Sequence, residues 1–428
     1  MELKKYKLAD IAKIEISGVD KKTIEGEIPV RLCNFVDVYY NWAITKEKAK
    51  SFMVASAKQT EIDKCSIGKG MVAITKDSET RDDIGVATYI ADDFENVVLG
   101  YHCALITPNP AIVDGKYLNA FIHTRYIQKY FENNASGSGQ RYTLSNDTIG
   151  NIPVLLPSIE EQHTIGKVLA DIDSKIELNK QINDNLEAMA KQLYDYWFVQ
   201  FDFPNEESKP YKASGGAMVW NDKLKREIPE GWYAENICKI ANILSGGTPS
   251  KAVDEYWNNG TIPFFGPTDC NGSVFQIKTA DHITQKGLEH CASSLFEEGI
   301  VIITARGSIG KLVIVGTPMA MNQSCYALQS KEGEYEYLYF LTTQLIDCLK
   351  AKGSGSVFKS IIASDIEHSA LCIATDNVVS DFCKKVKPMF EKLKANTIEI
   401  AELTKQRDEL LPLLMNGQAS VNYHLSDD

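Results

Sequence analysis

The feature that most restricts the fold of this sequence is an internal duplication. A mixed segment followed by a long heptad-patterned segment occurs once up to about Phe203 and again from about Trp232 to Gly417. Four landmarks recur in the same order, at offsets that fall from 229 to 216 residues. They pair residues 70–75 with 299–304, 102–105 with 325–328, 117–118 with 337–338, and 137–139 with 353–355. We therefore predict two similar heads, each followed by a long helix, a geometry that suits measuring a distance better than catalysis.

The two heptad segments are predicted to be long helices that pair as an antiparallel coiled coil. Ser158 and Glu161 form a capping box at the start of the first helix, and Pro388 is predicted to interrupt and kink the second. The alternative is two amphipathic helices, each packed only on its own head. The heptad positions are Ile165, Leu169, Ile172, Ile176, Asn179, Asn183, Leu186, Ala190, Leu193 and Trp197, then Val379, Phe382, Val386, Met389, Leu393, Asn396, Ile400, Leu403, Arg407, Leu410 and Leu414.

Polar residues at heptad positions, among them Asn179, Asn183 and Asn396, are expected to fix the register of the pair at some cost in stability. A second apolar stripe, Ile182, Met189 and Tyr196, runs beside the first. A single pairing seam does not need it. The stripe could pack on a head or dock a partner protein, and the sequence leaves both uses open.

The heads are predicted to mix α and β structure, which gives an α+β chain with a pseudo-two-fold repeat. Short β-branched runs at 71–74, 86–90, 300–304 and 312–315 indicate strands, and residues 119–131 and 337–350 indicate helices. The predicted parts are a first head (1–157), a first long helix (158–203), a linker (204–231), a second head (232–373), a second long helix (374–417) and a tail (418–428).

The charge distribution argues against tight binding of nucleic acid by this chain alone. The net charge is -12. Residues 1–155 carry 19 basic and 20 acidic groups, whereas residues 156–205 carry 4 and 9, so the first helix is the acidic part. Affinity for DNA depends on clustered Lys and Arg, so a DNA ligand would require a basic partner to share the phosphate contacts.

Neither a membrane protein nor a secreted one is indicated. The sequence has no run of 18 apolar residues, and its first residues do not lead into an apolar signal segment. The ten cysteines are scattered without a Cys-x-x-Cys pair, so we interpret them as reduced core residues of a cytoplasmic protein.

No catalytic or metal-binding motif is recognisable. The sequence lacks the Asn/Asp-Pro-Pro-Tyr of amino-methyltransferases and the Gly-x-Ser-x-Gly elbow, and residues 307–311 lack the spacing of a phosphate-binding loop. The seven His residues are dispersed. We therefore predict no catalytic residue, no metal ligand and no cofactor in this chain.

Several loops suit contact with DNA, because they combine hydroxyls, amides and cations. Each loop taken alone could equally be an ordinary solvated turn, and only its recurrence in both heads favours function. Tyr39, Tyr40, Tyr256 and Trp257 are interpreted as packing residues and not as base stackers. The candidates are Lys76, Arg81, Gln140, Arg141 and Tyr142 in the first head and Thr248, Ser250, Lys251, Thr268, Arg306, Lys311, Gln323 and Lys359 in the second.

These residues resemble a known family. Residues 155–162 (Leu-Leu-Pro-Ser-Ile-Glu-Glu-Gln), 173–183 and 196–202 are similar to the central helix of specificity subunits of Type I restriction-modification enzymes. Residues 246–250, 260–263, 306–311 and 322–324 resemble the pattern of its target-recognition domains, and residues 410–417 resemble its usual end. The resemblance covers essentially the whole chain.

The resemblance implies a non-catalytic subunit whose two target-recognition domains each read half of a split double-stranded DNA sequence. It also implies two methyltransferase subunits docked on the helices and heads, and a restriction subunit that cuts unmodified DNA. S-adenosylmethionine, ATP and magnesium would belong to those partners. The alternative is a methyltransferase or nuclease fusion. The first head lacks the Gly-Gly-Thr-Pro loop and the Arg-Gly-Ser-x-Gly-Lys turn, so the two heads are expected to read different half-sites.

Overall fold

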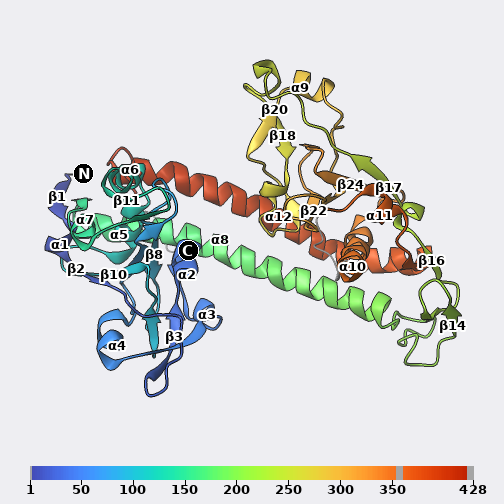
Figure 1. Ribbon diagram of the computed structural model, residues 1–428, viewed down its shortest axis with the longest axis horizontal. Helices are drawn as coiled ribbons and strands as arrows, with labels where there is room; N and C mark the ends of the chain where they lie inside the picture. The colour runs from blue at the N-terminus through green and yellow to red at the C-terminus, as the bar shows by residue number, and fades with distance from the viewer. Residues whose placement is uncertain (1, 353–359, 422–428) are drawn as a thin grey trace, which may run out of the picture. The chain divides into compact units, whose positions relative to one another are not determined.

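The computed structural model describes residues 2–352 and 360–421. Its contacts divide the chain into two compact units, Met1–Ile176 with Glu402–Asp428 and Glu177–Ala401. Two long helices, α8 (Ile159–Tyr194, green in Figure 1) and α12 (Asp376–Met415, red), each contribute residues to both units.

The first unit contains the first head, in which short strands alternate with short helices. The strands are β1 (Lys4–Lys7), β2 (Ala12–Ile16), β3 (Ile28–Cys33), β4 (Ala43–Ile44), β5 (Met53–Ala57), β6 (Val72–Thr75), β7 (Asp77–Ser78), β8 (Ala87–Ile90), β9 (Val97–Leu99), β10 (Cys103–Pro108), β11 (Ser136–Ser138), β12 (Arg141–Thr143) and β13 (Pro153–Leu156). The helices are α1 (Leu8–Ile11), α2 (Phe35–Tyr39), α3 (Lys46–Ala49), α4 (Gln59–Cys65), α5 (Gly115–Ile122), α6 (Arg125–Asn134) and α7 (Asn146–Gly150).

The second unit contains the second head and the segment before it. Its strands are β14 (Met218–Asn221), β15 (Arg226–Pro229), β16 (Tyr233–Glu235), β17 (Ala241–Ser245), β18 (Ile262–Phe265), β19 (Phe275–Gln276), β20 (Asp281–Ile283), β21 (Val301–Thr304), β22 (Leu312–Val315), β23 (Ala320–Met321), β24 (Cys325–Ser330) and β25 (Leu371–Ile373). The helices are α9 (Gln285–Glu289), α10 (Tyr335–Lys352) and α11 (Ala363–Glu367), with a π-helical turn η1 (Asp195–Val199) and the 3-10 turns η2 (Ile237–Lys239), η3 (Asp254–Tyr256) and η4 (Pro267–Asp269).

Sheet topology confirms the duplication. The main sheet of the first head has the order β2-β10-β6-β8-β4, and that of the second has β17-β24-β21-β22-β19. A three-stranded sheet accompanies each, β5-β3-β9 in one head and β20-β18-β23 in the other. The strand directions also correspond, because the pairs β4–β8 and β19–β22 are both parallel, as are β3–β9 and β18–β23.

One landmark pairing in the sequence was misplaced by one residue. Cys103 lies opposite Thr75, and Cys325 lies opposite Thr304, so Cys103 and not His102 corresponds to Cys325. A one-residue slip on a strand moves every side chain to the other face. The identities at Ala327 and Leu328 that suggested the wrong register are therefore coincidental matches between opposite faces.

The predicted helix at 119–131 is two helices. The chain breaks at His123 and Thr124, where the Thr124 hydroxyl caps α6 by accepting a hydrogen bond from the Ile127 amide at 3.5 Å. The His123 ring stacks on Trp42, with ring centroids 4.4 Å apart, and burial lowers its pKa to about 4. The break thus combines a local cap at Thr124 with a distant contact at His123, and helical periodicity alone does not reveal it.

Three further predictions need correction or fall outside the described residues. Pro388 does not interrupt the second long helix, since α12 continues through it. The glycine segment around Gly137 is not a loop but the hairpin β11–β12. Its predicted counterpart at 353–355, together with Lys359, lies outside the described residues.

The segment predicted as a linker is structured. Strands β14 and β15 pair as an antiparallel hairpin. Phe203 stacks on Tyr211 and on Trp232, with ring centroids 4.5 and 5.1 Å apart. The predicted linker is therefore packed against the start of the second head.

The core of the first unit is built from both ends of the chain. Ile165 and Leu169 of α8 pack with the head's strands and helices, and Leu411, Leu414 and Met415 of α12 belong to the same buried cluster. The end of α12 thus completes the hydrophobic core of the first head.

Arg407 reinforces this attachment. Its guanidinium lies 4.8 Å above the Trp42 ring, on a residue of the first head, and one of its nitrogens is 3.5 Å from Asp173 of α8. The Arg407 side chain, at a polar heptad position, therefore joins α12 both to α8 and to the first head within the first unit.

The core of the second unit takes its helical part from α10, from the other halves of α8 and α12, and from the turn η1 that follows α8. Tyr194, Trp197 and Phe198 pack on Phe382 of α12 and Phe340 of α10. Each long helix therefore serves two hydrophobic cores. The alternative of helices packed only on their own heads is wrong.

An antiparallel seam joins the two helices within the second unit. The Asn179 amide donates to Glu399 at 2.9 Å, and the Asn396 amide donates to the side-chain oxygen of Asn183 at 2.9 Å. Because the partner number falls as the α8 number rises, the helices run antiparallel. Asn179 and Asn396 are buried, so their hydrogen bonds fix the register as predicted.

The remaining predicted seam residues are buried or partly buried. Ile176, Val386 and Leu393 are buried, and Ile172, Leu186, Leu193, Ile400, Leu403 and Leu410 are partly buried. Ile182 of the second stripe is also partly buried.

Within the described part of the chain, no helix is long and apolar enough to cross a membrane. All ten cysteines are free thiols, and seven of them are buried.

The Asn183–Asn396 pair provides a test of the seam. We expect Asn183→Leu or Asn396→Leu alone to lower the free energy of unfolding by about 1–3 kcal/mol. The first leaves the buried Asn396 amide without its acceptor, and the second leaves the side-chain oxygen of the partly buried Asn183 without its donor. The double variant should recover most of this loss, because two leucines then face each other. The measurement is urea unfolding, with Asn185→Leu on the exposed face of α8 as the control. Additive losses in the double variant would contradict the contact.

Candidate nucleic-acid interface

In the second head, close backbone packing brings the predicted loops together. The Gly247 amide donates to the Met321 carbonyl at 3.0 Å. A Cβ on Gly246 would lie 2.2 Å from the Asn322 carbonyl oxygen, so only glycine allows this approach. The loop after β17 is therefore pressed against the turn between β23 and β24.

Side chains extend this junction. The Thr248 hydroxyl is hydrogen-bonded to the side-chain oxygen of Gln323, which joins two of the predicted contact residues. The Lys251 ammonium lies 5.4 Å over the Trp257 ring and 4.0 Å from Asp281. A hydroxyl, an amide and a cation are thus held at one edge of the head.

The turn between β21 and β22 joins the same group. The amides of Ala305 and Arg306 both donate to the Ser324 carbonyl, at 2.8 and 3.2 Å. The Lys311 ammonium donates to the Cys270 carbonyl at 3.4 Å. A Cβ on Gly307 would lie 3.7 Å from Pro267, so the turn bearing Thr268 is its neighbour.

All seven described candidates of the second head are exposed, and the contacts above link the four loops that carry them. They are Thr248, Ser250, Lys251, Thr268, Arg306, Lys311 and Gln323. Such a surface offers hydroxyl, amide and cationic groups to phosphates and to base edges.

In the first head, Asp77 organises the candidates. Its carboxylate lies 3.2 Å from Lys76, 2.6 Å from the His102 ring and 3.2 Å from Arg141. Burial favours the neutral acid, but hydrogen bonds from Thr143 and His102 and the Lys76 ammonium outweigh it and lower the pKa of Asp77 to about 2. Asp77 is therefore ionised at neutral pH, and Lys76 is engaged in this cluster.

The other candidates lie around this cluster. The hairpin β11–β12 pairs with β7, which places Arg141 and Gln140 beside the Asp77 strand. The Arg81 guanidinium lies 5.0 Å over the Tyr142 ring. The structure thus gathers the candidates of the first head through ionic and ring contacts, where the second head uses close-packed glycines.

Sequence reasoning missed three residues of this surface. Asp77 and His102 were not considered, although Asp77 adjoins Lys76 and His102 lies in a landmark. Tyr40 was interpreted as a packing residue, but 76% of it is exposed. That interpretation is right for Trp257, which packs edge-on against Phe264, and for Tyr256, which stacks on His290.

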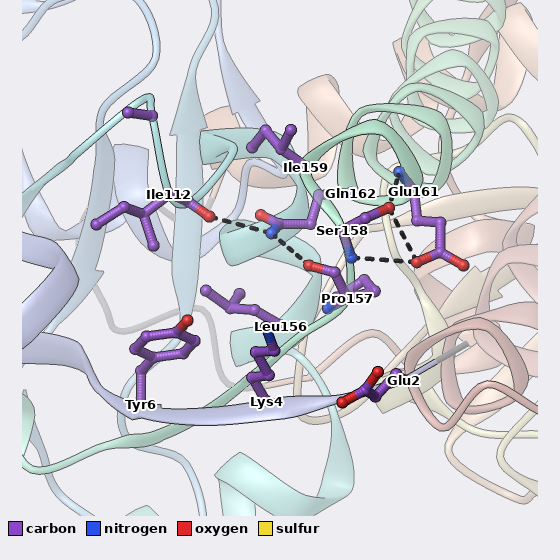
Figure 2. A pocket seen from close by; sticks show the side chains of 11 residues that line it. Glu2, Lys4, Tyr6, Ile112, Leu156, Pro157, Ser158, Ile159, Glu161 and Gln162 are labelled. Carbon is purple, nitrogen blue, oxygen red and sulfur yellow. Dashed lines mark hydrogen bonds between the residues drawn. The ribbon is translucent and has the colours of Figure 1, made fainter.

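The start of α8 is anchored to the first head. The Ser158–Glu161 capping box is present, with the Ser158 amide donating to Glu161 at 3.1 Å and the Glu161 amide donating to Ser158 at 3.3 Å. The buried Gln162 amide donates to the carbonyls of Ile112 and Pro157, both at 3.1 Å, beside a pocket that Figure 2 shows. The Pro-Ser-Ile-Glu-Glu-Gln motif is therefore a helix start fastened to the head.

Two of the three residues of the second stripe are exposed. Met189 of α8 is 53% exposed and Tyr196, in the turn η1 that follows α8, is 36% exposed, whereas Ile182 is partly buried. Leu178, on the same helix, is 50% exposed. Packing on a head therefore does not account for Met189.

Comparison with known proteins decides the family. The model of the Type I restriction modification DNA specificity domain matches residues 1–188 and 229–373. The chain belongs to this family. It is 26% identical over 392 residues to the Type I restriction enzyme HindI specificity subunit of Haemophilus influenzae, covering 80% of this chain and 85% of that protein.

Two further similarities agree with the assignment. The Type I restriction enzyme MjaIX specificity subunit of Methanocaldococcus jannaschii is 28% identical over 334 residues, covering 74% of this chain and 71% of that protein. The crystal structure of a Type-I restriction-modification system S subunit from M. genitalium superposes with a TM-score of 0.58 at 15% identity, covering 97% and 96% of the two chains, and shares the fold. The family assignment confirms the prediction of a DNA specificity protein, as distinct from a catalytic subunit.

Gly246→Ala tests the loop junction of the second head. The added methyl group must displace the Asn322 carbonyl, so we expect the free energy of unfolding to fall by about 1–3 kcal/mol. Gly18→Ala is the control, because a Cβ there meets no atom within 4 Å. Thermal unfolding of both variants measures the effect, and equal melting temperatures would argue against the close approach.

Proposed function

We propose that this chain is the DNA-recognition subunit of a Type I restriction-modification complex and that each head reads one half of a bipartite target. The observation that carries the proposal is the recurrence of one sheet topology with polar and cationic loops at matching places. In each head the connection after the central strand, β6 or β21, bears such residues, Lys76 and Arg81 in one and Arg306 and Lys311 in the other.

The two long helices would set the spacer between the half-sites. At 1.5 Å per residue, α8 is about 54 Å long and α12 about 60 Å long. The heads differ in their contact loops, so the half-sites are expected to differ in sequence.

The partners would be two methyltransferase subunits and a restriction subunit, in the cytoplasm. Supporting this are the exposed stripe of Met189 and Tyr196 and the acidic balance of residues 156–205, which suits a basic partner better than DNA. S-adenosylmethionine, ATP and magnesium would act on those subunits. A methyltransferase or nuclease fusion, the alternative, is not favoured, because the matching family model is a DNA specificity domain.

Mapping methylated bases across DNA from cells with and without this chain tests the proposal. We expect a split motif in the presence of the chain that disappears in its absence, while the methyltransferase subunit remains expressed. A motif that persists without this chain would overturn the assignment. A chain that methylates or cuts DNA alone would support the catalytic alternative.

The spacer is tested by adding one heptad to each helix, between Ile176 and Asn179 in α8 and between Glu399 and Leu403 in α12. Seven residues keep the seam in phase and lengthen each helix by about 10.5 Å, the rise of about three base pairs. We expect a longer spacer with both half-sites unchanged in the methylated motif. A matched pair of substitutions without insertion serves as the control, and an unchanged spacer would contradict the ruler role.

A further inference from the structure

The surface of the first head carries a hollow of about 550 Å³ whose chemistry points to one kind of ligand. Three elements line it: α2 with Phe35, Tyr39 and Tyr40, the Asp77 strand with the turn that follows, and the β11–β12 hairpin. Tyr39 meets Tyr40 edge-on, with ring centroids 4.8 Å apart. An aromatic wall thus faces polar and cationic side chains.

Arg141 is held at this hollow in a defined orientation. Its Nη2 lies 3.2 Å from the Asp77 carboxylate and contacts both ring nitrogens of His102, Nδ1 more closely than Nε2. A guanidinium has five N–H donors, and all of these contacts use Nη2. The Arg141 side chain is 57% exposed, whereas that of Asp77 is only 10% exposed. Asp77 therefore holds the Arg141 guanidinium through Nη2, and much of the Arg141 side chain stays open to solvent.

The charges around the hollow favour a base edge over a phosphate. Asp77, Glu79 and Asp83 line it, against the single permanent cation Arg141 and the titratable His102. Tyr39 donates to Asp83 at 2.7 Å, and Lys76 lies beside Asp77. Glu79 and Asp83 repel an anion, and Asp77 already offsets the charge of Arg141. An arginine fork, in contrast, matches the O6 and N7 acceptors of guanine.

We propose that this hollow receives the edge of a guanine in the first half-site, that Arg141 reads it, and that Asp77 is the positioning residue that orients Arg141. The inference rests on the proposed function and adds to it a base and two residue roles. Gln140, exposed on the same hairpin, lies next to Arg141 and also lines the hollow.

The test uses the complex of this chain with its methyltransferase subunit. Oligonucleotides carrying each of the four bases at every position of the methylated motif compete for binding. We expect Arg141→Ala to lose roughly 5- to 150-fold of the preference for guanine at one position of one half-site, with the other half-site unchanged. Arg141→Lys keeps the positive charge but not the planar guanidinium, and should weaken the preference for guanine at the same position. Arg125→Ala, an exposed arginine of the same head, is the control.

Asp77→Asn keeps Arg141 and should weaken the preference for guanine at that same position. A purely structural role of Asp77 would not change the preference at one position alone. Thermal unfolding of each variant is measured beside the binding. Unchanged preferences at every position in both Arg141 variants would overturn the reading role, and unchanged preference in Asp77→Asn would overturn the positioning role. A wild-type complex with no preference at any position would instead refute the proposed function itself.

Discussion

The hydrogen bond from the buried Asn396 amide to the partly buried Asn183 is the contact on which the pairing of the two long helices depends. It fixes the antiparallel register of α8 and α12, because a slip would leave a buried amide without a partner. The same helices supply Ile165 and Leu169 to one core and Tyr194 and Phe382 to the other. The register of α8 and α12 therefore determines which of their residues enter the core of the first unit and which enter the core of the second.

The parts of the fold that depend on local patterns could be predicted from the sequence. Heptad spacing, the Ser158–Glu161 box and the repeated β-branched runs each lie within a few residues, so they are visible in one dimension. What was missed depends on distant contacts. The contacts among Asp77, His102 and Arg141 join residues that are 25, 39 and 64 positions apart in the sequence. Trp42 likewise contacts His123, at the break between two helices, from a distant part of the chain.

The two heads reach similar surfaces by different physical means. In the second, Gly246 and Gly247 let backbones approach closely, and the loops are held by main-chain hydrogen bonds. In the first, one ionised carboxylate holds three basic side chains from separate segments. A shared topology thus tolerates unrelated solutions at its contact loops, which is how duplicated domains can acquire different targets.

The role of Leu411, Leu414 and Met415 in the first core bears on how the chain is made. A ribosome synthesises these residues about 250 positions after the first head, a delay on the order of tens of seconds. Until they emerge, the first head has an incomplete core and exposes apolar surface. A chain cut short by premature termination would keep that defect permanently. Exposed apolar surface of this kind favours aggregation and proteolysis of the truncated chain.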